Sequence, residues 1–195
     1  MSQVRRIYVE KKQGFDIEAK GILEDLKENL SMSGLKNVRI INRYDVEGIT
    51  DEEYSRARGL IFSEPPVDNA YDEVIDISDG KVFAVEYLPG QFDQRAASAE
   101  ECISILTQKE RPTVRSAKLY VLVGDVSDAE TEKVKAYVIN PVEAREASLE
   151  KPETLDITVD IPKDVAVVDG FTEMNDEQKR NLLNSMGFAM DIDDL

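Results

Sequence analysis

The chain has 195 residues, of which 42% are hydrophobic, and a formal net charge of −16 from 40 acidic and 24 basic residues. That size and composition are typical of a globular protein with one or two domains, and the negative charge argues against a nucleic acid or an anionic membrane surface as partner. The sequence contains no histidine, which excludes a histidine general base, a Ser-His or Cys-His nucleophile and a histidine metal site.

Strand and helix patterns alternate through the first 80 residues. Apolar residues at every second position predict strands, and apolar residues spaced three and four apart predict helices. Pro65 and Pro66 end the second helix, because proline cannot continue one. The expected elements are a strand at 5–11, a helix at 15–30, a strand at 37–48, a helix at 50–62 and a strand at 71–78.

The same order then starts again. In the second helix of this half, Asn140 and Pro141 mark the end. The expected elements are a strand at 81–90, a helix at 92–107, a strand at 115–125, a helix at 127–139 and a strand at 155–162.

A constant offset of 77 residues relates the two runs. It links Phe15-Asp16 with Phe92-Asp93, and it links two capping boxes that begin at Thr50 and Ser127. We interpret the pattern as a duplicated βαβαβ unit in an α+β fold, with a pseudo-twofold relation between the copies. A single unit of this size would be marginal alone, so we expect the copies to join sheet edges or to pack face to face.

The domain boundaries follow from this pattern. We expect a first repeat at 1–80, a second repeat at 81–163 and a linker region at 164–195. The linker should hold one helix at about 175–186, with Asn175 as its cap and Gly187 after its end. The last residues look like the start of a further helix, which favours a fragment of a longer protein.

The segment at 86–98 is the first candidate for a binding site. A simple structural interpretation is a Pro89-Gly90 turn, a helix cap at Asp93 and a core position for Phe92. The functional alternative places three polar residues at a helix N-terminus, where an anion or a partner carboxylate would be favoured. These residues, which the first repeat does not share, are Gln91, Gln94 and Arg95.

Two further stretches are candidates for contact with another domain. Arg111 and Arg115 belong to the most basic part of the chain, which is either a solvated loop running into an edge strand or a docking patch. Arg145 begins a stretch that is either a linker or a clamp between domains. The single cysteine, Cys102, is expected to face the core and not to act as a nucleophile. One cysteine also fits a reducing compartment such as the cytoplasm.

Several long motifs resemble one enzyme family. They include "RRIYVEKKQGFDIEAKG", "NRYDVEGITDEEY", "VEYLPGQFDQRAAS", "ERPTVRSAKLYVL" and "INPVEAREASLEKPETL". Over essentially its whole length the chain resembles the N-terminal region of single-chain phosphoribosylformylglycinamidine synthase of the clostridial and bacteroidal type. The second repeat is also similar to the small PurS-type subunit of the multi-subunit forms, through "VEYLPG" and "INPVEA". The first repeat departs from this pattern: at the same offset it has Lys12-Gln13 and Ser63-Glu64-Pro65.

The resemblance implies a non-catalytic part of a purine-biosynthesis ligase. It implies that the region is equivalent to a fused PurS-type dimer whose partners are the synthase and glutaminase domains of the same chain. It places ATP, Mg²⁺ and the glutaminase triad in the parent enzyme, and neither a cofactor, a metal nor a catalytic residue in this part. An alternative function, from the paired units alone, is a stand-alone ligand-sensing or interaction module.

Overall fold

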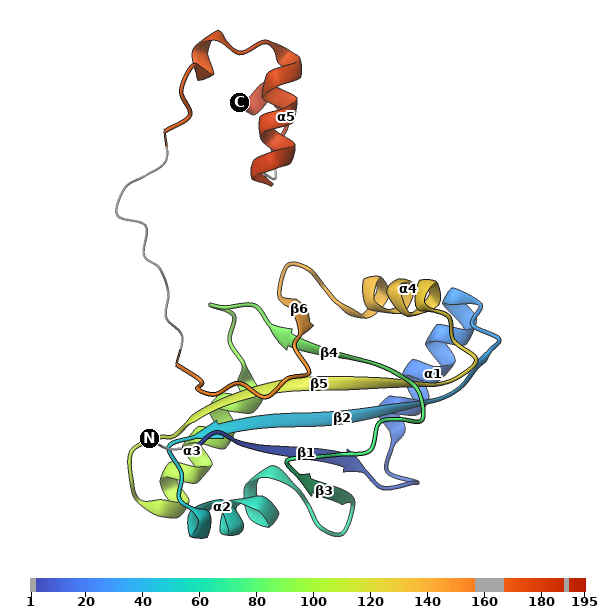
Figure 1. Ribbon diagram of the computed structural model, residues 1–195, viewed down its shortest axis with the longest axis vertical. Coiled ribbons are helices and arrows are strands. Elements are labelled where there is room, and N and C mark those ends of the chain that lie inside the picture. The colour runs from blue at the N-terminus through green and yellow to red at the C-terminus, as the bar shows by residue number, and fades with distance from the viewer. Residues whose placement is uncertain (1–2, 157–166, 188–189) are drawn as a thin grey trace. The chain divides into compact units, whose positions relative to one another are not determined.

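The computed structural model describes residues 3–156, 167–187 and 190–195. The chain divides into two compact units, Met1–Asp156 and Ile157–Leu195. The first unit contains all the strands described below, and the second contains one α-helix (Figure 1).

The first unit is built on one six-stranded antiparallel sheet, which confirms the predicted α+β class. Its strand order is β3-β1-β2-β5-β4-β6, so β2 and β5 lie at the centre and β3 and β6 at the edges. The basic stretch at 109–118 therefore leads into a central strand and not into the predicted edge strand. The strands are β1 (Arg5–Lys11), β2 (Leu35–Glu47), β3 (Asp68–Asp72), β4 (Lys81–Tyr87), β5 (Thr113–Gly124) and β6 (Ala144–Ala147).

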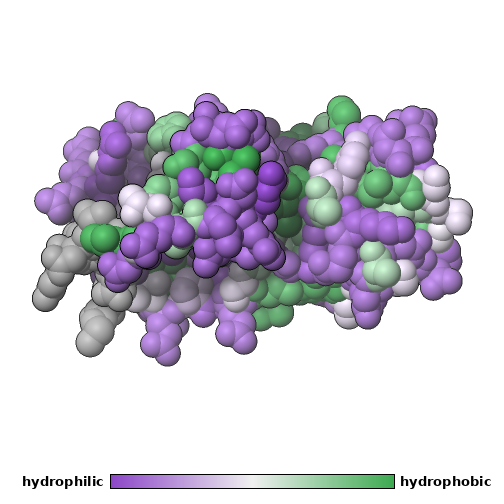
Figure 2. Space-filling view, turned by 90° about the horizontal axis from the view of Figure 1, so that it is seen from above, coloured by the Kyte–Doolittle hydropathy of each residue, from purple (hydrophilic) through white to green (hydrophobic). Residues whose placement is uncertain are grey.

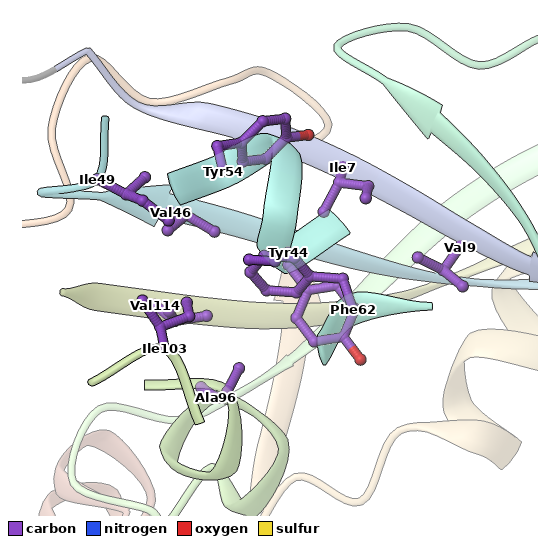
Figure 3. Close-up of a cluster of buried hydrophobic side chains, with 12 residues drawn as sticks. Ile7, Val9, Tyr44, Val46, Ile49, Tyr54, Phe62, Ala96, Ile103 and Val114 are labelled. Atoms are coloured by element: carbon purple, nitrogen blue, oxygen red, sulfur yellow. The ribbon is translucent and has the colours of Figure 1, made fainter. Parts of the chain in front are cut away.

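The helices of this unit cover one side of the sheet, which we call the helix face. Alternate strand residues such as Ile7, Tyr44 and Tyr120 point to it, because side chains along a strand alternate between faces. One apolar cluster lies under α2 and α3 (Figure 3), and another lies under α1 and α4. The helices are α1 (Ile17–Leu30), α2 (Asp51–Ala57), α3 (Gln94–Thr107) and α4 (Asp128–Val138).

The helix predicted at 50–62 changes geometry part-way. It is α-helical in α2 and continues as a π-helical turn, η1, at Arg58–Phe62. The wider turn changes which side chains face inward, so Phe62 is buried and Leu60 is 72% exposed.

Both predicted third strands were placed too late in the sequence. The first is β3, at Asp68–Asp72, where the prediction was 71–78. In the second half the edge strand is β6, at Ala144–Ala147. Of the strand predicted at 155–162, Leu155 and Asp156 are not in a strand, and the remaining residues lie outside the described part of the chain. The physical reason is that each edge strand begins directly after its proline turn. There the Val67 carbonyl already accepts from the Lys12 N–H, just after β1, and the Glu143 carbonyl accepts from the Leu88 N–H, just after β4.

The two halves join edge to edge through β2 and β5. In this register Asn42 lies opposite Lys118, and Tyr44 and Tyr120 are each two residues beyond that pair. The strand order is the same from either edge when β1, β2 and β3 are matched with β4, β5 and β6. Of the two arrangements expected from the sequence, joined sheet edges or packed faces, the structure has the first, while the duplication itself stays an interpretation of the sequence.

Two extended segments cross the opposite side of the sheet, which we call the strap face. The first strap, residues 73–80, leads from β3 to β4 and packs Ile75 and Ile77 on the apolar strap face. The second strap, residues 148–156, follows β6 and is drawn in orange across the strands in Figure 1. Its Leu155 is only 1% exposed.

The second unit contains the predicted helix as α5, Asp176–Met186. Asn175 caps it in a capping box with Gln178, and Gly187 follows it in the left-handed conformation, both as predicted. Leu183 of this helix is buried, whereas Met186 is 52% exposed. Two short 3-10 turns, Phe171–Glu173 and Ile192–Asp194, complete this unit.

Candidate functional site

The candidate segment begins with a tight turn at residues 88–91. The Gln91 N–H donates to the Leu88 carbonyl at 3.0 Å, and Gly90 has a φ of +92°. Proline at the second position and glycine with positive φ at the third are typical of a type II turn. The Pro-Gly turn predicted from the sequence is confirmed.

Asp93 fixes the start of α3 against β5. Its carboxylate accepts from the Ala96 N–H at 2.9 Å, as an N-cap does, and also from the N–H and Oγ of Ser116, both at 3.0 Å. The predicted cap is therefore correct. The matching residue Asp16 makes no cap bond to α1, and it accepts instead from the Gly14 N–H at 2.9 Å.

The same turn occurs in the first half, one residue closer to its helix. The Phe15 N–H donates to the Lys12 carbonyl at 2.9 Å, and Gly14 has a φ of +96°. Gly14 and Gly90 are 76 residues apart, whereas the two aspartates before the helices are 77 apart. One extra residue, Gln91, in the second half explains why the glycine seemed out of place in the sequence.

The proline turns also match at an offset of 76. Asn140 and Glu64 each accept two backbone hydrogen bonds through their carbonyls, from residues three and four positions later. The structure therefore matches Glu64-Pro65 with Asn140-Pro141, and not Ser63-Glu64 as the offset of 77 implied. A sequence comparison at one fixed offset could not reveal this.

Arg95, in the first turn of α3, reaches from the second half to the first. Its Nη1 donates to the Tyr44 hydroxyl at 3.1 Å. The Tyr44 ring centroid is 5.0 Å from that of Phe62, and its hydroxyl lies at the outer edge of the apolar cluster (Figure 3). Burial lowers the pKa of Arg95, but the hydrogen bond to Tyr44 and nearby negative charge raise it by more. Arg95 is therefore a permanent cation.

Two cavities of the helix face meet at Arg95 and Asn42, and together they form what we call the central cleft. The larger, of ≈ 790 Å³, lies between α1, β1, β2 and η1, and the smaller, of ≈ 290 Å³, lies between β4, β5 and the end of α4. Both residues line both cavities. These volumes lie near the usual range for small-molecule sites.

The other basic side chains of the central cleft are paired with carboxylates. Lys118 contacts Glu18 at 2.5 Å, and the remaining pairs are Arg39–Glu10, Lys11–Asp68 and Lys20–Asp16. Within the described ranges, Arg95 has no carboxylate at salt-bridge distance. The side-chain amide of Asn42, which is half-buried, has no hydrogen bond there either. Arg95 and Asn42 are thus available to a ligand.

The remaining predicted contact residues lie in different places. Gln94 lines a neighbouring hollow of ≈ 410 Å³ together with Arg95, and the Gln91 amide is 3.5 Å from the Val142 carbonyl. Arg111 is exposed and 3.7 Å from Glu101. The structure thus brings Gln94 and Arg95 together.

Two of the predicted residues lie on the strap face. Arg115 donates to the carbonyl of Leu155 in the second strap. Arg145, in β6, donates to Glu86 at 2.8 Å. The stretch that begins at Arg145 was predicted to be a linker or a clamp between domains, and it forms an edge strand followed by a strap within one unit.

Sequence analysis missed a buried ionic cluster on the strap face. Arg6, Arg43 and Asp45 are 2%, 5% and 3% exposed. Arg6 donates to both carboxylate oxygens of Asp45, at 2.6 and 2.9 Å, and Arg43 Nε lies 3.5 Å from Asp45. Charged residues that alternate with apolar ones are also typical of a solvent-exposed strand face, so the sequence pattern did not indicate that these three are buried.

This cluster holds the second strap through its backbone. Arg43 donates to the carbonyl of Ser148 at 2.7 Å, and Arg6 donates to the carbonyls of Leu149 and Glu150 at 2.8 and 3.1 Å. Burial lowers the pKa of Arg43, although the charge of Asp45 opposes this effect.

Two residues assigned to the core are exposed. Phe92 is 74% exposed, and the matching Phe15 of the first half, which lacks the extra residue before it, is also exposed, by 53%. Cys102 is also exposed and lines the same hollow as Gln94 and Arg95. The inward face of α3 is formed instead by Ala96, Ala99 and Ile103. Helical spacing had predicted Cys102 on this face, but Ile103, one position later, occupies it.

No protein-family model matches the chain, and no curated protein matches it. Within the described residues, no group of three or more His, Cys, Asp or Glu side chains is arranged to hold a metal ion. Among the helices of the described part, none is both long and apolar enough to cross a membrane.

Proposed function

We propose that this chain is a non-catalytic N-terminal region of phosphoribosylformylglycinamidine synthase, a purine-biosynthesis enzyme. Its role is to hold the synthase and glutaminase domains in register, so that ammonia released from glutamine reaches the synthase. The parent enzyme then supplies ATP, Mg²⁺ and all catalytic groups, and acts in the cytoplasm. The basis of this assignment is the resemblance of the motifs.

The observation that best supports a docking role is where the motif residues gather. "VEYLPG" and "INPVEA" are far apart in sequence, yet the Leu88 N–H donates to the Glu143 carbonyl at 2.9 Å. Around this contact three large apolar side chains are exposed, Tyr87 by 45%, Phe92 by 74% and Val142 by 76%. Exposed apolar residues that gather on an acidic surface are typical of an interaction site. We call these three residues the turn patch.

Figure 2 shows one side of the molecule as mostly hydrophilic, with smaller hydrophobic areas between. A partner that docks on the turn patch would gain apolar burial of about 25 cal/mol per Å².

A deletion separates the docking role from catalysis. We expect a parent enzyme without residues 1–195 to lose glutamine-dependent synthesis and to keep synthesis from added ammonium. Unchanged glutamine-dependent synthesis would rule out the role. The reading frame beyond Leu195 gives an independent test, since synthase motifs must follow there.

A point variant tests the surface. In the parent enzyme, Phe92→Ser should lower glutamine-dependent synthesis without unfolding the domain, because the side chain is exposed. Ile105→Ser is the matched control, as Ile105 is 71% exposed on α3 and lies outside the turn patch. Equal effects of the two substitutions would count against the turn patch as the docking surface.

A second candidate function is ligand sensing, which the central cleft favours. Thermal-shift measurements on the 195-residue chain with nucleotides and amino acids distinguish it from docking alone. A specific rise in melting temperature supports sensing, and no rise with any compound opposes it.

A further inference from the structure

The centre of the helix face differs between the two halves in a way that creates a site. Glu18 and Arg95 occupy matching positions in the first turns of α1 and α3, and Asn42 and Lys118 lie opposite each other on β2 and β5. Glu18 pairs with Lys118 at 2.5 Å. When the two halves are exchanged, the positions of Glu18 and Lys118 correspond to those of Arg95 and Asn42. An ion pair on one side is therefore replaced by a cation and an amide on the other.

We propose that Arg95, Asn42 and Tyr44 bind the oxyanion group, carboxylate or phosphate, of a small organic anion in the central cleft. This proposal does not depend on the synthase assignment, and its test uses the 195-residue chain alone.

The three side chains offer complementary donors. Arg95 uses one N–H bond on the Tyr44 hydroxyl and has four further N–H donors. The Tyr44 hydroxyl accepts from Arg95, so its own proton is available to donate, and the Asn42 amide adds two more. A guanidinium fork matches a carboxylate or phosphate in geometry as well as in charge.

The surrounding residues favour an anion at this point despite the acidic chain. Asp93, the carboxylate nearest in sequence, already accepts three hydrogen bonds, two of them from Ser116. Glu18 is neutralised by Lys118. Glu18 and Asp93, the two carboxylates whose charge acts on Arg95, thus already have partners, while Arg95 keeps its charge.

The shape of the cleft indicates the rest of the ligand. The larger cavity extends from Arg95 along Ile40 and Val38 of β2 and is closed on another side by Ile61 and Phe62. The other residues that line this cavity are mostly polar or charged, so a compound with an oxyanion group at one end and a body that offers both apolar surface and hydrogen-bonding groups fits this arrangement. A volume of ≈ 790 Å³ is sufficient for a nucleotide-sized molecule.

The test is a titration followed by ¹H–¹⁵N NMR, with phosphate, acetate, AMP and benzoate as probes. We expect saturable shifts of the Asn42 side-chain amide and the Arg95 Nε–H, with AMP or benzoate binding more tightly than the bare ion. Tighter binding of AMP identifies a phosphate ligand, and tighter binding of benzoate identifies a carboxylate. Absence of saturable shifts with all four probes overturns the proposal.

Variants separate the site from general attraction. Arg95→Ala should weaken binding by about tenfold or more, as expected for lost charged hydrogen bonds. Arg111→Ala removes the same charge from the surface and should leave the affinity unchanged. Equal weakening by both substitutions overturns the proposal. If Arg95→Ala does not fold, Asn42→Ala provides the same comparison.

The single cysteine provides an independent readout. Cys102 lines the hollow beside Arg95, so its reaction with a thiol reagent should slow when the best probe binds to the wild-type chain. The reaction rate of Arg95→Ala should not respond to the probe. A response that persists in Arg95→Ala places the ligand elsewhere and contradicts the proposal.

Discussion

The two straps occupy equivalent places in the fold but are held by different chemistry. The first strap places Ile75 and Ile77 on an apolar surface that includes Val121. The second strap rests its carbonyls on buried arginines, and at the position matching Val121 the sheet carries Asp45. The same crossing can thus be stabilised by apolar burial or by an ionic cluster. The two solutions should respond differently to mutation.

The largest expected effect is on the ionic cluster. Asp45→Ala should lower the free energy of unfolding by about 3–5 kcal/mol, because it leaves two arginines buried without a counter-charge. Its apolar counterpart, Val121→Ala, should cost about 2 kcal/mol from lost burial and a cavity. Urea unfolding measures both. Equal costs would mean that the cluster is no more sensitive than the apolar strap.

Replacing the whole cluster is the control for this comparison. The combined variant Arg6→Val, Arg43→Leu, Asp45→Val carries the residues of the second half and should be far less damaging than Asp45→Ala. Hydrogen exchange at residues 148–156 should nevertheless become faster, because the strap loses the bonds to Arg6 and Arg43. Unchanged exchange would show that these bonds do not hold the strap.

The helix starts provide a second comparison of the halves. Asp93→Ala should cost about 1–2 kcal/mol, since it removes a cap and the link to Ser116. Asp16→Ala should have a smaller effect, because Asp16 makes no cap bond to α1. Thermal unfolding of the two variants gives the order, and a larger loss for Asp16→Ala would contradict the assigned roles.

The two turn glycines should behave alike. Gly14→Ala and Gly90→Ala each introduce a Cβ at positive φ, with no atom within 4 Å to clash with it. Backbone strain alone then costs about 1 kcal/mol in both halves. Denaturant midpoints of the two variants should shift equally. Unequal shifts would show that the two turns differ in more than the one extra residue of the second half.

The smallest effect concerns the capping boxes at low pH. Hydrogen bonds from Lys109 and from Thr50 lower the pKa of Glu53 from 4.5 to about 2. A lowered folded-state pKa stabilises the fold above about pH 4.5, and this stability is lost as the pH falls toward 2. Glu53→Gln should reduce the change in stability with pH across that window. NMR titration of the Glu53 carboxyl checks the value, and a pKa near 4.5 would contradict it.

The matching box gives the control for this titration. The Ser127 bonds lower the pKa of Glu130, but no lysine contributes a hydrogen bond there. Glu130→Gln should therefore reduce the loss of stability at low pH by less than Glu53→Gln does.

Local patterns in the sequence predicted the helices, the caps and the central strands correctly. Alternation identified β1 and β2, and the capping boxes at Thr50 and Ser127 are present as expected. The edge strands were misplaced, because β6 is only four residues long and its sequence, AREA, has no strand-like alternation. Its position is set by pairing with β4.

The site was predicted only in part, for a similar reason. Arg95 was identified because it breaks the repeat, but its partner Tyr44 is 51 residues away in sequence. The role of Asn42 depends on its pairing with Lys118, which is visible only once β2 and β5 are aligned. Likewise, no local pattern could show that Arg6 would meet the backbone of residues more than 140 positions later.

The pairing of Asn42 with Lys118 has one more consequence. In a homodimer of identical halves the residue at this place would face its own copy, and two lysines there would repel each other. A covalently continuous chain is free of that constraint, so it can place a neutral side chain opposite a charged one. The two sides of the sheet centre are therefore chemically different, and a ligand bound there would have a single orientation.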